Sequence, residues 1–323
     1  RMEGRNKTTS GRGYIIFATL MFAVLAWMKS TYIPHLPSLE VIFVMFLVTF
    51  IMNYYLLNGA LFKPFLENDD NSYSIKLCGG LAVGFIACFY YALNFISTQS
   101  AIVIFNFGFI GVILLELFVL NESYTKPQLI LAAGSFIGMW ITVGGQDFEY
   151  WQQEITSPNG FWGFCLSLAA AAMLAIMMIN FGKMYDENFA SMNHIFSMMI
   201  VLFLPVFFPI QGVHRPTGGE WLLLILMGVM NTAAVLSFIR GLQIENPGNV
   251  SIFLYLQPAL TFFLNMLSGA AGGFGATLGA IICIASLVLY SRETRRKIIV
   301  RETFIQKEGK IIEELREMNQ DAI

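Results

Sequence analysis

Charged side chains are scarce in this sequence. Only 12 % of its 323 residues are Asp, Glu, Lys or Arg, whereas 56 % are apolar. A soluble domain of ordinary composition has about 25 % charged and 45–50 % apolar residues. The missing charge excludes an ordinary soluble domain, and the long uncharged runs indicate an integral membrane protein.

Motifs of catalysis and of metal or nucleotide binding are missing as well. The sequence has no GxSxG or HExxH motif, no nucleotide-binding P-loop and only three histidines. Its four cysteines have no CxxC spacing and fall in or beside apolar runs, as small buried hydrophobes do. We therefore expect no enzyme, no metal, no other cofactor and no direct hydrolysis of ATP.

Ten apolar runs are long enough to cross a membrane as helices, which takes about 20 residues each. They lack the alternation of barrel strands. The sequence therefore predicts an all-α membrane protein with ten transmembrane helices. The predicted spans are residues 14–32, 41–59, 76–96, 100–120, 127–145, 160–180, 190–210, 221–240, 249–268 and 272–291.

Lys and Arg are distributed unequally between the two ends of these spans. If the N-terminal segment 1–13 is cytoplasmic, nine basic residues before the C-terminal tail lie on its side, and only Lys29 and Arg215 lie on the other. The positive-inside rule therefore places the N-terminus in the cytoplasm, and the even number of spans places the C-terminus there too. The choice between the plasma membrane and an internal membrane stays open.

The chain repeats its organisation at an offset of 149 residues. Residues 92–111 align with residues 241–260, because in both a helix end and a tight polar turn precede a long apolar span. The two halves are residues 14–145 and 160–291, joined by an acidic extracytoplasmic loop, 146–159. With five spans each, the halves must cross the membrane in opposite directions, as the inverted repeats of secondary transporters do.

Small and polar residues recur in a characteristic order in the two halves. They are Ala92-Leu93, the turn from Ser97 to Ser100, Glu122, Gly138, Gly241-Leu242, Gly248 and Pro258. In this order the chain resembles the drug/metabolite transporter superfamily, whose EamA-type five-helix repeats also build the solute carrier 35 group. The resemblance implies a transporter fold in which the third, fourth, eighth and ninth helices contribute to a central cavity.

The ninth predicted span carries a helix-breaker near its centre. Pro258 has no N–H, so the carbonyl of Leu254 loses its helical partner and we expect a kink. In lipid such a break is tolerated where it faces protein or a water-filled cavity, and Gln257 beside it could supply a donor. A cavity-facing role and a purely structural kink both remain open.

Two stripes of mixed aromatic and polar residues occupy matching positions in the two halves. At helical spacing each stripe lies along one face, so they are candidates for opposite walls of one pathway; hydrogen bonding between helices is the alternative. The stripes are Ser251, Tyr255, Pro258, Phe262 and Asn265 in the ninth span, and Ile102, Asn106, Phe109, Ile113 and Glu116 in the fourth.

Eight residues are candidates for contact with a substrate. Glu116 is the one acidic residue well inside a predicted span, which suggests substrate binding or proton coupling; the alternatives are snorkelling to water and an ion pair with a basic residue such as Arg240. Tyr90 and Asn94 are spaced to share a face of the third span, and Asn231 is the main polar residue of the eighth. The full set is Tyr90, Asn94, Asn106, Glu116, Asn231, Tyr255, Gln257 and Pro258.

These features predict a secondary transporter of a small polar organic solute (a metabolite, amino acid, nucleobase or nucleotide-sugar), working by alternating access. A non-transporting receptor or scaffold with the same fold is the alternative. We expect the solute and the bilayer as partners, and no nucleic acid. The glycine pairs at spacing four, such as Gly134/Gly138, favour packing within the chain over a homodimer. The tail 292–323 is predicted to be an amphipathic helix that binds the membrane surface or a cytoplasmic partner.

Overall fold

The computed structural model describes residues 10–57, 70–119, 121–144, 157–210, 212, 214–269 and 273–296, and within these ranges all regular structure is helical. Nine of the helices are long and apolar enough to cross a membrane. The predicted loop 146–159 lies largely outside the described residues, and so does the predicted tail beyond residue 296.

The first half of the chain forms five long helices. Their order along the chain is α1 (Ser10–Tyr32), α2 (Ser38–Leu56), α4 (Asp70–Ala92), α5 (Thr98–Val119) and α6 (Lys126–Val143). The ends of α6 show why the chain turns where it does. Thr125 and Gln128 form a capping box at its start, and Gly144, at a φ of 123°, ends it.

The second half repeats this order with more interruptions. It contains α8 (Pro158–Lys183), α9 (Phe189–Phe203) continued by the 3₁₀ helix η1 (Leu204–Ile210), and α10 (Gly218–Ile244). The ninth predicted span is divided into α11 (Pro247–Ser251), the 3₁₀ helix η2 (Ile252–Tyr255) and α12 (Leu256–Leu267). The last described helix runs over Phe274–Arg296.

The ten predicted spans coincide with these helices, but the count of ten membrane spans is not confirmed and some of the predicted ends are wrong. In the described part of the chain nine helices qualify as spans by length and composition, and α6 does not, because its 18 residues begin with Lys126, Pro127 and Gln128. The first helix begins at Ser10 rather than residue 14. The third ends at Ala92, four residues before its predicted end.

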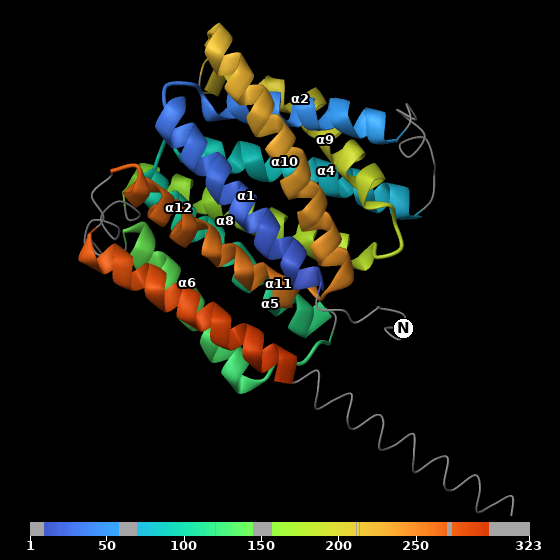
Figure 1. The fold of residues 1–323 in the computed structure, drawn as a ribbon. Helices are drawn as coiled ribbons and strands as arrows, with labels where there is room; N and C mark the ends of the chain where they lie inside the picture. The colour runs from blue at the N-terminus through green and yellow to red at the C-terminus, as the bar shows by residue number, and fades with distance from the viewer. Residues whose placement is uncertain are drawn as a thin grey trace, which may run out of the picture.

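Helices of the first half pack against helices of the second half. Each such contact has a counterpart in which the two halves swap roles. The first helix, α1, packs along α10, the third helix of the second half; α4, the third helix of the first half, packs along α8, the first of the second (Figure 1). In the same way α5 packs on α8 and α12 packs on α1, while the equivalent helices α2 and α9 contact each other. The arrangement is that of two similar units related by an approximate twofold axis.

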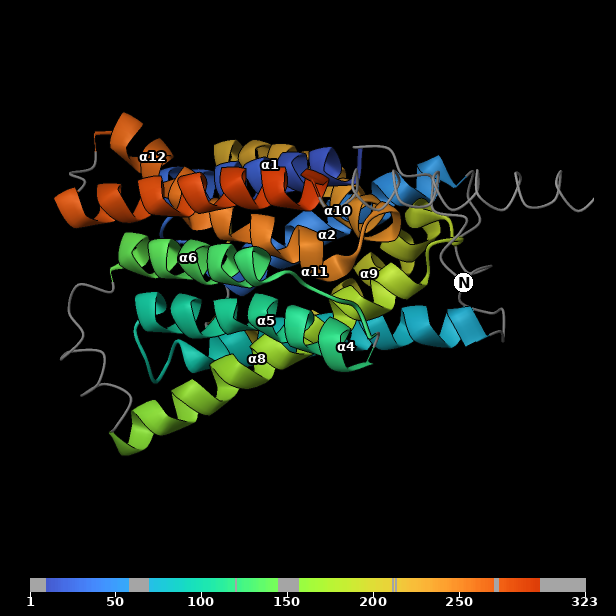
Figure 2. The same ribbon diagram turned by 90° about the horizontal axis from the view of Figure 1, so that it is seen from below.

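The helices that end the two halves, α6 and the last helix, lie side by side at one edge of the bundle (Figure 2). They touch through glycines. A Cβ on Gly138 would lie 2.8 Å from the Cα of Cys283, and a Cβ on Gly279 would lie 2.6 Å from the backbone N of Thr142. The backbones therefore approach as closely as only glycine permits, so Gly138 and Gly279 serve packing within the chain.

Candidate functional site

The helical pattern of the ninth span breaks at its centre, as Pro258 predicts. The break lies one turn ahead of the proline, where residues Ile252–Tyr255 wind as a 3₁₀ helix. The N–H of Leu256 donates to the Phe253 carbonyl, which is the i→i+3 pattern of a 3₁₀ helix. The supply of a donor to the Leu254 carbonyl by Gln257 stays a prediction. The fourth span shows no such break, since α5 is continuous from Thr98 to Val119 and has Phe109 at the matching position.

Tyr255 stands at this break and joins the two halves. Its side chain is fully buried, its hydroxyl donates to the backbone carbonyl of Asn106 at 3.2 Å, and its ring meets Phe109 edge-on at 5.3 Å between centroids. Tyr255 and Asn106 are 149 residues apart, which is the offset of the repeat. Equivalent residues touch only where they lie next to a twofold axis, so the break lies at the centre of the bundle.

The two predicted stripes therefore meet, although they differ in exposure. In the first half Asn106, Phe109, Ile113 and Glu116 are all buried. The Nδ2 of Asn106 donates to the Ile102 carbonyl of its own helix at 2.7 Å. In the second half the 3₁₀ turn interrupts the stripe: Ser251 and Tyr255 are buried, whereas Pro258, Phe262 and Asn265, which lie beyond it, are half-buried.

Glu116 is fully buried, and its carboxylate is held by two donors. Oε1 accepts from the backbone N–H of Gly248 at 2.8 Å, and Oε2 accepts from the hydroxyl of Tyr124. The carboxylate thus satisfies an N–H in the first turn of α11, where a negative charge also complements the helix dipole. Glu116 is not paired with Arg240, contrary to one of the expectations. Arg240 instead donates to Gln243 and lies over the Phe189 ring.

Tyr124 lies in the short segment between α5 and α6. Burial, followed by the charge of the Glu116 carboxylate, raises the pKa of the Tyr124 phenol far above its usual value. The phenol therefore stays protonated and keeps donating to the carboxylate over the whole physiological range of pH. A side chain at Gly248 would collide with both groups and would have to displace the phenol or the carboxylate.

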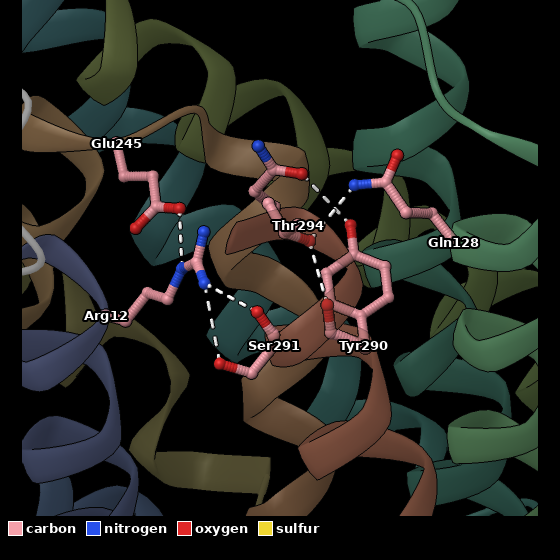
Figure 3. Close-up of polar contacts among 7 residues, drawn as sticks. Arg12, Gln128, Glu245, Tyr290, Ser291 and Thr294 are labelled. Carbon is pink, nitrogen blue, oxygen red and sulfur yellow. Dashed lines mark hydrogen bonds and ion pairs between the residues drawn. The ribbon is translucent and has the colours of Figure 1, made fainter. Parts of the chain in front are cut away.

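Further contacts at the same end of the bundle tie the first half to the second (Figure 3). From α1, Arg12 donates through Nε to Glu245 at 2.8 Å and through Nη1 to the Ser291 carbonyl at 3.0 Å. Gln128 of α6 donates to Thr294 of the last helix at 3.0 Å. We call the contacts Arg12–Glu245, Arg12–Ser291, Glu116–Gly248 and Gln128–Thr294 the inter-half network.

A second group of polar side chains lies between α2, α9 and α10. Asn231 donates to Thr49 at 3.1 Å, so this predicted site residue faces α2 rather than the break. Nearer the end that carries the inter-half network, the amide of Asn193 contacts that of Asn53 at 3.5 Å. The Nδ2 of Asn53 and the Oδ1 of Asn193 are buried without a hydrogen-bond partner among the described residues.

Tyr90 and Asn94 do not share a helix face, contrary to the prediction. Tyr90 lies on α4, and its hydroxyl hydrogen-bonds with the side chain of Ser38 at the start of α2. Asn94 is exposed in a turn closed by a bond from the Phe95 N–H to the Ala92 carbonyl. The helix ends early because Ser97 already begins the next one, accepting from the Ser100 N–H.

Sequence reasoning placed Glu116, Asn106 and Tyr255 on facing helices but missed their partners. It counted Arg12 only as one positive charge among many, and it overlooked Tyr124, Gln128 and Thr294. One available signal was Glu245, an acidic residue directly after the eighth span on the end of the bundle that is otherwise rich in Lys and Arg.

These features define an integral, multi-pass α-helical membrane protein built from two similar halves. The model of the EamA-like transporter family matches residues 9–144 and 161–292, one match in each half, and the chain belongs to this family. The match confirms the predicted kinship with the drug/metabolite transporter superfamily and identifies a membrane transporter family.

Solved structures support the fold independently. One described as "Crystal structure of protein" superposes with a TM-score of 0.75 and 16 % sequence identity, covering 90 % of this chain and 100 % of the other. At this identity the likeness concerns the fold alone. No curated protein matches the sequence.

Proposed function

We propose that the protein is a secondary transporter that moves a small polar organic solute by alternating access. The main observation in support of this proposal is the contact of Tyr255 with Asn106 at the break in the ninth span. There the two halves meet at equivalent residues, and a 3₁₀ turn interrupts the α-helical pattern of a membrane span. In membrane proteins such a turn is tolerated inside the protein or against water, and carriers place their sites at this level.

The two halves are proposed to cross the membrane in opposite directions as two sets of five helices. The exchange pattern supports this, because α1 packs on α10 as α4 packs on α8. Two units related in this way can rock about their common axis, which opens a central site to one side at a time. The orientation with both termini in the cytoplasm is inferred from the distribution of Lys and Arg.

The solute is proposed to be uncharged or zwitterionic, because amides and hydroxyls dominate the polar groups near the centre. Gln257 and Pro258 are half-buried beside the break, whereas Tyr255 and Asn106 are occupied by each other in this conformation. Asn231 and Tyr90 bond to α2, and the exposed Asn94 lies at the end of the bundle opposite the inter-half network. The proposed substrate contacts remain these residues and Glu116, engaged in turn as the halves move.

This conformation is proposed to be closed at the end that carries the inter-half network. The bonds Glu116–Gly248 and Gln128–Thr294 are buried there. At the opposite end the bonds between the halves, Trp27–Ser268 and His35–Glu220, are exposed to solvent. Exposed polar contacts contribute little to stability, so that end opens more easily.

The test is transport by purified protein in liposomes, with amino acids, nucleobases and nucleotide-sugars screened for uptake and exchange. We expect an amino acid or a nucleobase to be transported; transport of the anionic nucleotide-sugars alone would contradict the proposed uncharged or zwitterionic solute. For that solute, Gln257→Ala should lower kcat/KM about tenfold, the equivalent of one lost hydrogen bond. Movement of no solute by folded protein would favour a receptor or scaffold, and unchanged transport by both Gln257→Ala and Glu116→Gln would remove these two contacts from the site.

A further inference from the structure

A groove of about 310 Å³ lies between α1 and the last helix, with the break in the ninth span as its floor. Ile16 and Val288 at its edges are 41 % and 47 % exposed, so the groove opens sideways from the bundle and not toward its axis. It is lined by Ile16, Phe253, Leu256, Ile284, Leu287, Val288, Ser291, Arg292 and Arg295.

The groove is apolar along most of its length and basic at one end. Ile284, Leu287 and Val288 precede Arg292 by one to two turns of the last helix, so the apolar wall extends about 12 Å from the arginines at 1.5 Å per residue. Arg292 and Arg295 are exposed, and within the described part of the chain neither forms an ion pair. Arg12 nearby is already paired with Glu245.

Glu293 forms no ion pair with Arg292 or Arg295 in the part of the chain that the structure describes. It adjoins Arg292 in sequence but is not one of the residues that line the groove. Two guanidinium groups, neither in an ion pair with a described residue, lie at the mouth of an apolar channel and complement a ligand that has an anionic head and a hydrocarbon tail. A polar solute would make no favourable contact with the apolar walls. A small free anion would bind at the arginines alone and would not reach the apolar part of the groove.

We propose that the groove binds one anionic glycerophospholipid, with its phosphate at Arg292 and Arg295 and an acyl chain along the apolar wall. In the proposed orientation this lipid comes from the cytoplasmic leaflet, which carries the anionic lipids. The chain would contact Phe253 and Leu256 on either side of Tyr255, so the lipid braces the broken span in this conformation. The binding itself requires neither transport nor a particular orientation.

Native mass spectrometry of the full chain in detergent, titrated with phosphatidylglycerol or phosphatidylcholine, tests the proposal. We expect one phosphatidylglycerol to bind at least tenfold more tightly than phosphatidylcholine. Changing Arg292→Gln together with Arg295→Gln should weaken it about thirtyfold, since each basic side chain near anionic lipid contributes about 1 kcal/mol. Lys126→Gln with Lys183→Gln removes equal charge from exposed positions outside the groove and should leave binding within about twofold.

A second variant tests the apolar wall. Val288→Trp fills the groove and should weaken phosphatidylglycerol binding while leaving the arginines in place, with folding checked by thermal unfolding. Soluble glycerophosphoglycerol, which has the headgroup without acyl chains, should bind far more weakly than the lipid. The proposal is overturned if the double arginine variant binds as the wild type does, if phosphatidylcholine competes equally, or if the soluble headgroup binds as tightly as the lipid.

Discussion

Glu116 shows how a carboxylate is kept within the apolar part of the bundle. An ionised side chain in hydrocarbon is costly unless its oxygens find donors. Here the two donors come from different halves of the chain, the N–H of Gly248 in the second and the hydroxyl of Tyr124 in the first. The residue therefore connects the halves while it satisfies its own charge.

Replacing Glu116 should loosen this connection. Glu116→Gln keeps an acceptor for the Gly248 N–H but turns an amide donor toward the Tyr124 hydroxyl, which now has to bond elsewhere. A hydrogen bond to a charged group contributes about 1.5–3 kcal/mol, so we expect a clear fall in the thermal unfolding temperature measured in detergent. Glu122→Gln, on the neighbouring segment, is the control and should unfold close to the wild type; equal unfolding temperatures for all three proteins would refute the role.

At the scale of single residues, the sequence identified the important polar side chains of the spans but not their hydrogen-bond partners. Asn106, Glu116 and Tyr255 stand out because polar groups are rare in apolar spans, and their spacing shows that each set shares a helix face. Gly248 could not be identified as the partner of Glu116, because the two are 132 residues apart and the contact depends on how α11 meets α5. Asn94 was misplaced, because local capping by Ser97 ends its helix early.

The division of the ninth span into α11, η2 and α12 is the element on which the proposed mechanism depends. A 3₁₀ turn has poorer hydrogen-bond geometry than an α-helix and often marks a hinge. It lies against a buried contact between the halves, the bond from Tyr255 to Asn106. Motion of one half against the other can therefore be taken up at this turn.

Restoring the missing N–H should stiffen the hinge. Pro258→Ala gives the Leu254 carbonyl an ordinary helical partner, so we expect transport in liposomes to fall about tenfold while the unfolding temperature holds or rises. The control is Pro127→Ala in the first turn of α6, where proline fits without loss. Full transport by Pro258→Ala would show that the break has no part in the cycle.

The crossing of α6 with the last helix has a sharper steric requirement. A Cβ on Gly138 would lie 2.8 Å from the Gly279 carbonyl oxygen, and backbone cannot move aside as a side chain can. We expect Gly138→Ala to cost about 1–3 kcal/mol of stability, as overpacking does, measured as a lower unfolding temperature. Gly80→Ala in α4 would meet nothing within 4 Å and should be neutral or slightly stabilising; a similar loss in both variants would contradict this account.

Apolar run length predicted where the helices are, and proline predicted the break, because both effects act within one segment. The ends of helices were less well placed, since they depend on single capping residues such as Thr125 and Ser157. The continuity of α5 also follows from its own sequence, because Phe109 keeps the N–H that Pro258 lacks.

For the whole molecule, composition alone was enough to identify a membrane protein. The odd number of predicted spans in each half leads us to expect that the halves are inverted. The pairing of α1 with α10 and of α4 with α8 supports the proposal of an inverted repeat. The inter-half network could not be predicted from the sequence, because Arg12 and Ser291 are 279 residues apart and meet only once all the helices have packed.

The central claim is that the two halves cross the membrane in opposite directions, and two equivalent turns test it most directly. His35 follows the first helix of the first half, and Tyr185 follows the first helix of the second; both are exposed. Single cysteines at these positions, with the four native cysteines replaced, would be labelled by a reagent that cannot cross membranes, in sealed vesicles of the membrane that holds the protein, with its cytoplasmic side inward. We predict labelling of His35→Cys from outside and of Tyr185→Cys only after the membrane is permeabilised. Labelling of both from the same side would contradict the inverted arrangement.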